Sequence, residues 1–287
     1  MFLKQCVPWQ VRMGAKMVLS RLPVPYRAWK VMSAFEHGGM NRPQYALDVF
    51  KRHWQRAAFE KKDKGGFVAL ELGPGDSLFS ALIAKAFGAS KTYLVDVGPF
   101  ATSNFRSYRS MVRLLESNGF ALPGCAVASN LEELLTACAA VYLTDGLSSI
   151  KDIPTESVDF VWSQAVLEHV RRCDFEPLVR DLKRIHKSCG VSSHRVDLKD
   201  HLGGALNNLR FKHSVWESDF MVKSGFYTNR IRFTEMLRVF WECGFRSELV
   251  EVDRWSKLPT PREKLTKPFS ALPSDELNIS GFDVVLH

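Results

Sequence analysis

The chain has 287 residues, of which 46% are hydrophobic and 24% charged, with a formal net charge of +8. This length suits one large globular domain with an elaboration, and no apolar run approaches the roughly 20 residues that span a bilayer. Six scattered cysteines without a C-x-x-C pair argue against a zinc ribbon or a disulfide framework and favour a reducing cytoplasm. The positive charge indicates an acidic substrate, nucleic acid or an anionic membrane surface, but no arginine-rich tail or RNA-binding module accompanies it. We therefore do not expect nucleic acid as the partner.

The first 65 residues are predicted to be helical and to form an N-terminal cap. The opening "MFLKQCVPWQ" lacks an apolar core and a cleavage site, so we expect no secretory signal. Residues 11–22 have a basic face beside an apolar face. Such a helix could rest on an anionic membrane, which would place the protein at the inner membrane face, or it could dock onto the rest of the chain. A second helix is predicted over 42–60, followed by a charged linker.

From residue 66 onward, short apolar runs alternate with helical patterns. This alternation predicts an α/β fold with a parallel sheet. The predicted strands cover 67–72, 91–97, 140–146, 158–164 and 191–198. Helices are predicted over 77–89 and 105–120, and residues 165–190 are predicted to form a helix, a turn and a second helix. Residues 201–230 have no clear period and are predicted to form an insertion. A helix over 231–245 and strands over 246–255 and 279–287 complete the chain.

The stretch "VALELGPGDSLF" places a glycine turn between a predicted strand and a predicted helix. A dinucleotide fingerprint would need a third glycine where Leu78 stands, and a phosphate-binding P-loop would need Gly-Lys-Ser/Thr. Glu71 and Asp76 flank the turn, and their carboxylates would repel a diphosphate at the helix N-terminus. They would favour a cation. S-adenosylmethionine carries an ammonium and a sulfonium and no phosphate, so it fits this turn better than NAD.

Residues 66–287 resemble the class I S-adenosylmethionine-dependent methyltransferases. The resemblance rests on "VALELGPGDS", "TYLVDV" and "SVDFVWSQAVLEHV", in this order. It implies a Rossmann-like fold with a mainly parallel seven-stranded sheet, an antiparallel last strand, and S-adenosylhomocysteine as product. Ser77 departs from the family pattern, because it replaces the third glycine of the longer G-x-G-x-G form.

The resemblance also implies which residues bind the cofactor. Asp96, at the end of the second strand, would accept hydrogen bonds from the ribose hydroxyls, and the loop after the third strand would meet the adenine. As alternatives, Asp96 could cap a turn, and Asp145-Gly146 could be an ordinary turn. The implied cofactor-binding residues are Glu71, Gly73, Gly75, Asp76, Asp96, Val97, Asp145, Gly146, Ser163 and Gln164.

Methyl transfer to a hydroxyl needs an aligned acceptor and a group that removes its proton. Because ligands of open α/β sheets lie beyond the carboxyl ends of the strands, the first candidate base is His201 and the second is His169. His37, in the N-terminal segment, is a third histidine that could reach the site. Glu168 and His169 could instead be solvated helix residues.

Two aspartates near His201 have two possible roles. Asp197 and Asp200 could orient the imidazole, or the three residues could bind a divalent ion, as in some family members. Since no further ligand is evident, no metal is predicted.

The parts outside the shared core are predicted to form the acceptor pocket. Their aromatic residues could stack on a sugar ring or a planar metabolite, or build a small extra core. These residues are Trp29, Phe35, Tyr45, Phe211, Trp216, Phe226 and Tyr227. The expected function is O-methylation of a sugar, glycan or small hydroxylated metabolite in the cytoplasm. An RNA methyltransferase and a non-catalytic cofactor-holding scaffold are the alternatives. The "SQAV" after the fourth strand disfavours an amide or exocyclic nitrogen acceptor.

Overall fold

The computed structural model describes residues 9–11, 13–14, 39–59 and 66–287. His37, Trp29, Phe35 and most of the helix predicted over 11–22 lie outside the described residues. Within the described part, no helix combines the length and the apolar character needed to cross a bilayer.

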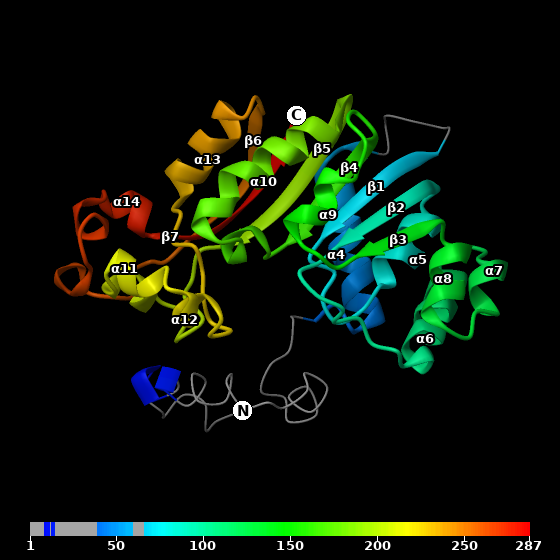
Figure 1. Cartoon of the computed structure of the whole chain (residues 1–287), viewed down its shortest axis with the longest axis horizontal. Helices are drawn as coiled ribbons and strands as arrows, with labels where there is room; N and C mark the ends of the chain where they lie inside the picture. The colour runs from blue at the N-terminus through cyan, green and yellow to red at the C-terminus, as the bar shows by residue number, and fades with distance from the viewer. Residues whose placement is uncertain (1–8, 12, 15–38, 60–65) are drawn as a thin grey trace.

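A seven-stranded sheet forms the centre of the molecule (Figure 1), with the strand order β3-β2-β1-β4-β5-β7-β6. The first five strands pair in parallel, whereas β7 is antiparallel to both of its neighbours. The strands are β1 Phe67–Leu72, β2 Ala89–Val95, β3 Ala140–Leu143, β4 Val158–Gln164, β5 His186–Asp197, β6 Ser247–Arg254 and β7 Ile279–Leu286. The predicted α/β fold with an antiparallel last strand is confirmed.

Helices cover both faces of the sheet, as can be followed in Figure 1. One face packs against α4 Pro43–Arg56, α5 Phe79–Ala86 and α6 Phe105–Ser117, with the short α7 Pro123–Ala126 and α8 Leu131–Ala137 beside them. The other face packs against α9 Leu147–Lys151, α10 Arg172–Ile185 and α13 Phe233–Glu242. The remaining short helices are η2 Leu167–His169, η3 Asn207–Arg210, α11 His213–Trp216, α12 Asp219–Val222, η4 Arg262–Lys264, η5 Phe269–Ala271 and α14 Ser274–Leu277.

Helix α4 shares the hydrophobic core of the sheet. Phe50 and Trp54 stand one turn apart on its buried face. The Phe50 ring lies edge-on to Trp162 at 5.1 Å between ring centroids, and the Trp54 ring lies edge-on to Phe160 at 5.6 Å. This part of the predicted N-terminal cap is therefore packed on the sheet, and the domain boundary near residue 65 stays a prediction.

The aromatic residues of the predicted insertion form a small core of their own. Trp216 and Phe226 are fully buried, and the indole N–H of Trp216 donates to the Thr228 carbonyl at 2.7 Å. Trp9 and Met13 pack against the same cluster, with the Trp9 ring edge-on to Phe211. Because Trp216 and Phe226 are inaccessible, they cannot stack on an acceptor. For these two residues, the extra-core alternative is correct.

The largest boundary error concerns the start of β5. The sequence predicts a helix to residue 190, but α10 ends at Ile185 and the strand begins at His186, which pairs with Val158. The pairing slips after Val158, and Gly190 lies so close to that strand that a Cβ would stand 3.0 Å from the Val158 carbonyl oxygen. The polar "HKSCG" thus forms an irregular strand start that its hydrophobicity does not reveal.

Candidate functional site

The glycine turn after β1 adopts a backbone that favours glycine. Gly73 and Gly75 have φ angles of +67° and +66°, in the left-handed region. The Gly73 N–H donates to the Val95 carbonyl at 2.8 Å, and the Gly75 N–H donates to Asp96 Oδ2 at 2.9 Å. The turn is therefore fixed against the end of β2.

Asp96 connects the loops at the carboxyl ends of three strands. Besides Gly75 from the first loop, the Val97 N–H donates to Asp96 Oδ1 at 2.7 Å. The Gly146 N–H, from the loop after β3, donates to the Asp96 carbonyl at 2.9 Å, and the Asp96 N–H donates to Leu143. Asp96 is 8% exposed. A partly accessible carboxylate at this point can accept hydrogen bonds from a ligand that lies over the strand ends.

The loop after β4 lies beside the loops that follow β1, β2 and β3. A Cβ on Gly73 would stand 2.6 Å from Val166 Cγ2, so this loop touches the glycine turn. Ala165 has a φ of +54°, which is uncommon for a non-glycine residue and occurs preferentially at functional sites. Four loops that carry the sequence motifs thus meet at one edge of the sheet. Neither Ala165 nor Val166 is singled out by the sequence.

Gly73→Ala should reduce the free energy of unfolding by about 2–5 kcal/mol. The left-handed backbone costs about 1–2 kcal/mol for a residue with a Cβ, and the overlap with Val166 adds about 1–3 kcal/mol. Gly88→Ala is the matched control, because Gly88 has a φ of +95° and no atom of the described residues lies within 4 Å of its Cβ position. Urea unfolding measures both variants. Equal losses in the two would contradict the close contact.

Residues near position 40 cover the glycine turn. The Ser77 hydroxyl donates to the Met40 carbonyl at 2.5 Å, and the Thr102 N–H donates to the Asp76 carbonyl at 2.9 Å. Asp76 is fully buried, whereas Asp145 is exposed. Of the carboxylates predicted to meet the cofactor, Asp96 is therefore the one that is both fixed at the strand ends and partly accessible.

Glu71 lies behind the glycine turn in the layer between the sheet and α5. Its carboxyl is 1% exposed and stands beside Ser80 and the indole of Trp162. Burial raises its pKa to about 8, with a smaller contribution from the Asp96 charge. Glu71 is therefore mostly neutral at pH 7, and the negative charge that we expected it to supply has to come from the aspartates.

The two predicted residues at the end of β4 face opposite sides of the sheet. Gln164 is half-buried, and its Oε1 accepts from His53 Nε2 of α4 at 3.1 Å, while His53 Nδ1 accepts from the Ser193 hydroxyl at 2.8 Å. Ser163 is fully buried, and a hydrogen bond of 2.8 Å joins its hydroxyl to His194 Nδ1. Gln164 is thus the more accessible of the pair.

Buried titratable groups predict a stability maximum near pH 6.5. Burial lowers the pKa of His53, His186 and His194 to about 3, so unfolding takes up protons below pH 6.5 and stability falls as the pH decreases. Burial raises the pKa of Glu71 and Glu168 to about 8, so their stabilising effect is complete below pH 4.5 and disappears as the pH rises through 8. Between pH 4.5 and 6.5 the three histidines outweigh the two glutamates; above 6.5 only the glutamates act.

Urea unfolding between pH 5 and 8.5 measures this dependence. We expect a decrease above pH 6.5 of at most about 2.7 kcal/mol per pH unit. Glu71→Gln should halve that decrease, because the amide keeps the size of the side chain and removes one titrating group. An unfolding free energy that climbs steadily to pH 8 would contradict the neutral state of both carboxyls.

The two candidate base residues contact each other. The rings of His169, in η2, and His201, in the turn after β5, lie 4.7 Å apart at 70°. A hydrogen bond of 3.0 Å joins His169 Nδ1 to the Tyr227 carbonyl, and since a carbonyl only accepts, Nδ1 carries the proton. In the neutral ring Nε2 is then an acceptor. The His169 N–H also donates to the Val166 carbonyl at 2.8 Å, which links the pair to the loop beside the glycine turn.

The aspartates expected near His201 have other partners. Asp200 is 3% exposed, and its carboxylate accepts from four backbone N–H groups, those of Leu202, Gly203, Gly204 and Asn207. Asp197 accepts from the Lys199 N–H and lies 3.6 Å from its ammonium. Asp200 thus stabilises the turn that carries His201. In the part of the chain that the structure describes, no three His, Cys, Asp or Glu residues are grouped so that they could hold a metal ion.

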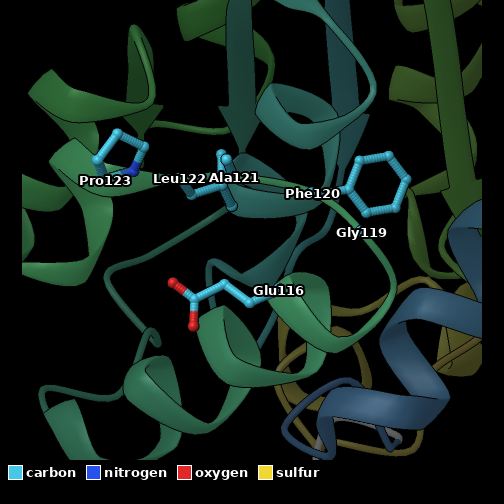
Figure 2. Close-up of a pocket in the computed structure, with 6 residues that line it drawn as sticks. All are labelled: Glu116, Gly119, Phe120, Ala121, Leu122 and Pro123. Atoms are coloured by element: carbon cyan, nitrogen blue, oxygen red, sulfur yellow. The ribbon is translucent and has the colours of Figure 1, made fainter.

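A surface hollow of about 350 Å³ lies between α6 and α7 (Figure 2). It is lined by Glu116, Gly119, Phe120, Ala121, Leu122 and Pro123. It borders the C-terminal end of α6, whose 13 residues begin near the strand ends. One helix length of about 20 Å therefore separates this hollow from the glycine turn, and it is not part of the site.

Comparison with known proteins gives matches to solved structures alone. No family model and no curated protein matches the chain. It is similar to an S-adenosylmethionine-dependent methyltransferase from Methanosarcina mazei, at 14% identity over 80% of this chain and 95% of that chain, with a TM-score of 0.47. A second, from Mesorhizobium loti, has 15% identity over 81% and 96% and a TM-score of 0.43. A third, from Haloferax volcanii in a complex with the methyltransferase activator Trm112, has 15% identity over 85% and 92% and a TM-score of 0.41.

At these identities the similarity concerns the fold. The strand order supports the predicted methyltransferase fold independently of these comparisons. β7 lies antiparallel between β5 and β6, as the sequence resemblance implied. The glycine turn, Asp96 and the loop after β4 meet at the carboxyl ends of the strands, where open α/β sheets bind their ligands. By its strand order and pairing, the chain has the class I S-adenosylmethionine-dependent methyltransferase fold.

Proposed function

We propose that this protein transfers a methyl group from S-adenosylmethionine to a hydroxyl of a sugar, glycan or small hydroxylated metabolite. The observation that carries this proposal is the contact between His169 and His201 on the edge of the sheet that also holds Asp96. A base is what a hydroxyl acceptor requires and what a more reactive nucleophile does not.

The residues around Asp96 fit the adenosyl group. The carboxylate of Asp96, a residue that is 8% exposed, would accept from the ribose hydroxyls, and its hydrogen bonds with the Gly75 and Val97 N–H groups fix its orientation. Val97 is 79% exposed, and a Cβ on Gly146 would stand 3.3 Å from its side chain, so an adenine beside Gly146 could contact the Val97 side chain. Bound here, S-adenosylmethionine would supply an activated methyl group beside the glycine turn.

The histidines then act on the acceptor. Nε2 of His169 takes the proton of the acceptor hydroxyl while the hydroxyl oxygen bonds to the methyl carbon and the carbon–sulfur bond breaks. The Tyr227 carbonyl keeps the His169 ring in the tautomer that this step needs. His201 lies close enough to limit the rotation of the ring and to share the emerging charge. Alignment of the two reactants supplies the larger part of the rate.

We further propose that the protein acts in the cytoplasm on a small or glycan acceptor. Trp9 and Met13 pack on the insertion, which supports docking of the N-terminal helix onto the domain over contact with the inner membrane face. A protein activator, such as the one bound to the Haloferax volcanii methyltransferase, is a further candidate partner.

The test is methyl transfer from labelled S-adenosylmethionine to three sets of acceptors: sugars, small polyols and RNA. We expect label in a hydroxylated small molecule, with little dependence on salt. Transfer to RNA with a steep loss at higher salt would favour an RNA methyltransferase. Cofactor binding without transfer to any acceptor would favour a scaffold protein.

A further inference from the structure

A small polar cavity lies next to the proposed base, at the carboxyl end of β5. Its volume is about 10 Å³, enough for one oxygen atom. Glu168, Asn208, Arg230 and Arg232 line it together with Asp197. The Asp197 side chain is 29% exposed, so the cavity adjoins the molecular surface there. Contrary to the solvated position considered for it, Glu168 is 2% exposed.

Four polar atoms of the lining residues have no hydrogen-bond partner among the residues that the structure describes. They are Glu168 Oε2, Asn208 Oδ1, Arg230 Nε and Arg232 Nε. All four residues are at most 4% exposed. An unsatisfied buried polar group costs about 1–3 kcal/mol, and four such groups around one cavity form a site for a ligand that both donates and accepts.

The two guanidinium groups are held in place by other contacts. Arg230 Nη1 donates to the Phe211 carbonyl at 2.8 Å, and the guanidinium lies over the rings of Trp216 and Phe269. Arg232 Nη1 donates to the Leu198 carbonyl and Nη2 to the Ile279 carbonyl. In each residue the Nε–H is therefore the group left for a ligand. The φ of Arg230 is +59°, a strained backbone of the kind found at functional sites.

Two backbone segments line the cavity and also hold the proposed base, His169. The Asn229 N–H donates to the Glu168 carbonyl at 2.7 Å, and the Tyr227 carbonyl binds the ring of His169. Glu168 and Thr228 both line the cavity. Glu168 directly precedes His169 in the chain, and Thr228 directly follows Tyr227, whose carbonyl binds the His169 ring. A molecule that reaches His169 has its neighbouring groups close to the cavity.

We propose that this cavity binds one hydroxyl oxygen of the acceptor, so that the acceptor is a polyol with a second hydroxyl presented to His169. A hydroxyl can accept from Arg230 and Arg232 and donate to Asn208. A carboxylate or phosphate is too large for this volume. A cation is disfavoured as well, because Glu168 is mostly protonated at pH 7 and the two guanidinium groups outnumber the Asp197 carboxylate. This inference rests on the proposed function and names the substrate class of the same site.

The test measures binding of glycerol, myo-inositol and methyl glycosides by saturation-transfer NMR and titration, in the presence of S-adenosylhomocysteine. In Asn208→Leu and Glu168→Leu, we expect at least a tenfold loss of affinity for the tightest-binding polyol. Glu168→Gln should lose less affinity than Glu168→Leu, because the amide keeps a polar group of the same shape in the lining. Asn118→Leu is the matched control, since Asn118 is exposed at the end of α6.

A deoxy analogue of the tightest polyol makes the test specific. Removal of the recognised hydroxyl should weaken binding to the unsubstituted protein and should have no further effect on Asn208→Leu. The proposal is overturned if the leucine variants bind polyols normally and only unfold more easily, which would mean that the cavity holds a structural water. It is also overturned if S-adenosylhomocysteine binds but no polyol does. Polyol binding without S-adenosylhomocysteine binding would instead contradict the proposed function.

Discussion

Asp96→Ala should lower the affinity for S-adenosylhomocysteine by about 10²–10⁴-fold. The carboxylate is proposed to accept from both ribose hydroxyls, and a hydrogen bond to a charged group contributes about 1.5–3 kcal/mol. The substitution also releases the Gly75 and Val97 N–H groups, so the glycine turn loses its attachment to β2. Isothermal titration calorimetry measures the affinity directly.

Two further variants separate these effects. Asp96→Asn keeps an acceptor oxygen for the backbone and removes the charge, so we expect an intermediate loss. Asp145→Ala changes an exposed carboxylate in the neighbouring loop and should have a much smaller effect. If Asp96→Ala folds and binds the compound as tightly as the unsubstituted protein, the ligand does not lie at the end of β2.

His169→Asn should reduce kcat by about 10²–10⁴-fold while the affinity for S-adenosylhomocysteine stays unchanged. The magnitude is that of a lost general base. The asparagine amide is able to donate to the Tyr227 carbonyl as Nδ1 does, so the local structure is preserved and the acceptor nitrogen is removed. Single-turnover methyl transfer to the acceptor found in the screen measures the chemical step.

His213→Asn serves as the control, because His213 is exposed on α11. The companion variant His201→Asn distinguishes the partners of the histidine pair: the larger loss of kcat identifies the base, and the smaller identifies the positioning residue. Imidazole added to the more damaged variant should restore part of the rate. Unchanged kcat in both variants would show that the acceptor needs no base from this pair.

Much of the fold could be predicted because the central strands are buried on both faces. β1 and β4 have the predicted bounds, since "FVALEL" and "VDFVWSQ" are rich in apolar and β-branched or aromatic residues and are flanked by polar or turn residues. The start of β5 could not be predicted, because His186 and Lys187 look like the end of a charged helix. The strand starts at His186 because His186 pairs with Val158, which lies 28 residues earlier in the chain.

Site residues could be predicted only where the local sequence determines the backbone conformation and the position of the side chain. The glycine turn has a left-handed backbone, which the two glycines in the sequence indicate directly. The spacing from the turn to Asp96 places a carboxylate at the end of the adjacent strand. The burial of Glu168 had no such signal. Glu168 is buried beside Asn208 and Arg230, which belong to the insertion over residues 201–230. Residues whose role is created by distant segments look like ordinary polar residues in the sequence.

Calorimetric titration with three adenosine-bearing ligands tests the central claim most directly. If the aspartates beside the glycine turn select a positively charged adenosyl compound, S-adenosylmethionine should bind at micromolar concentration with one ligand per chain, and NADH and ATP should not bind detectably. Tight binding of NADH or ATP, with no heat from S-adenosylmethionine, would contradict the account of the whole site.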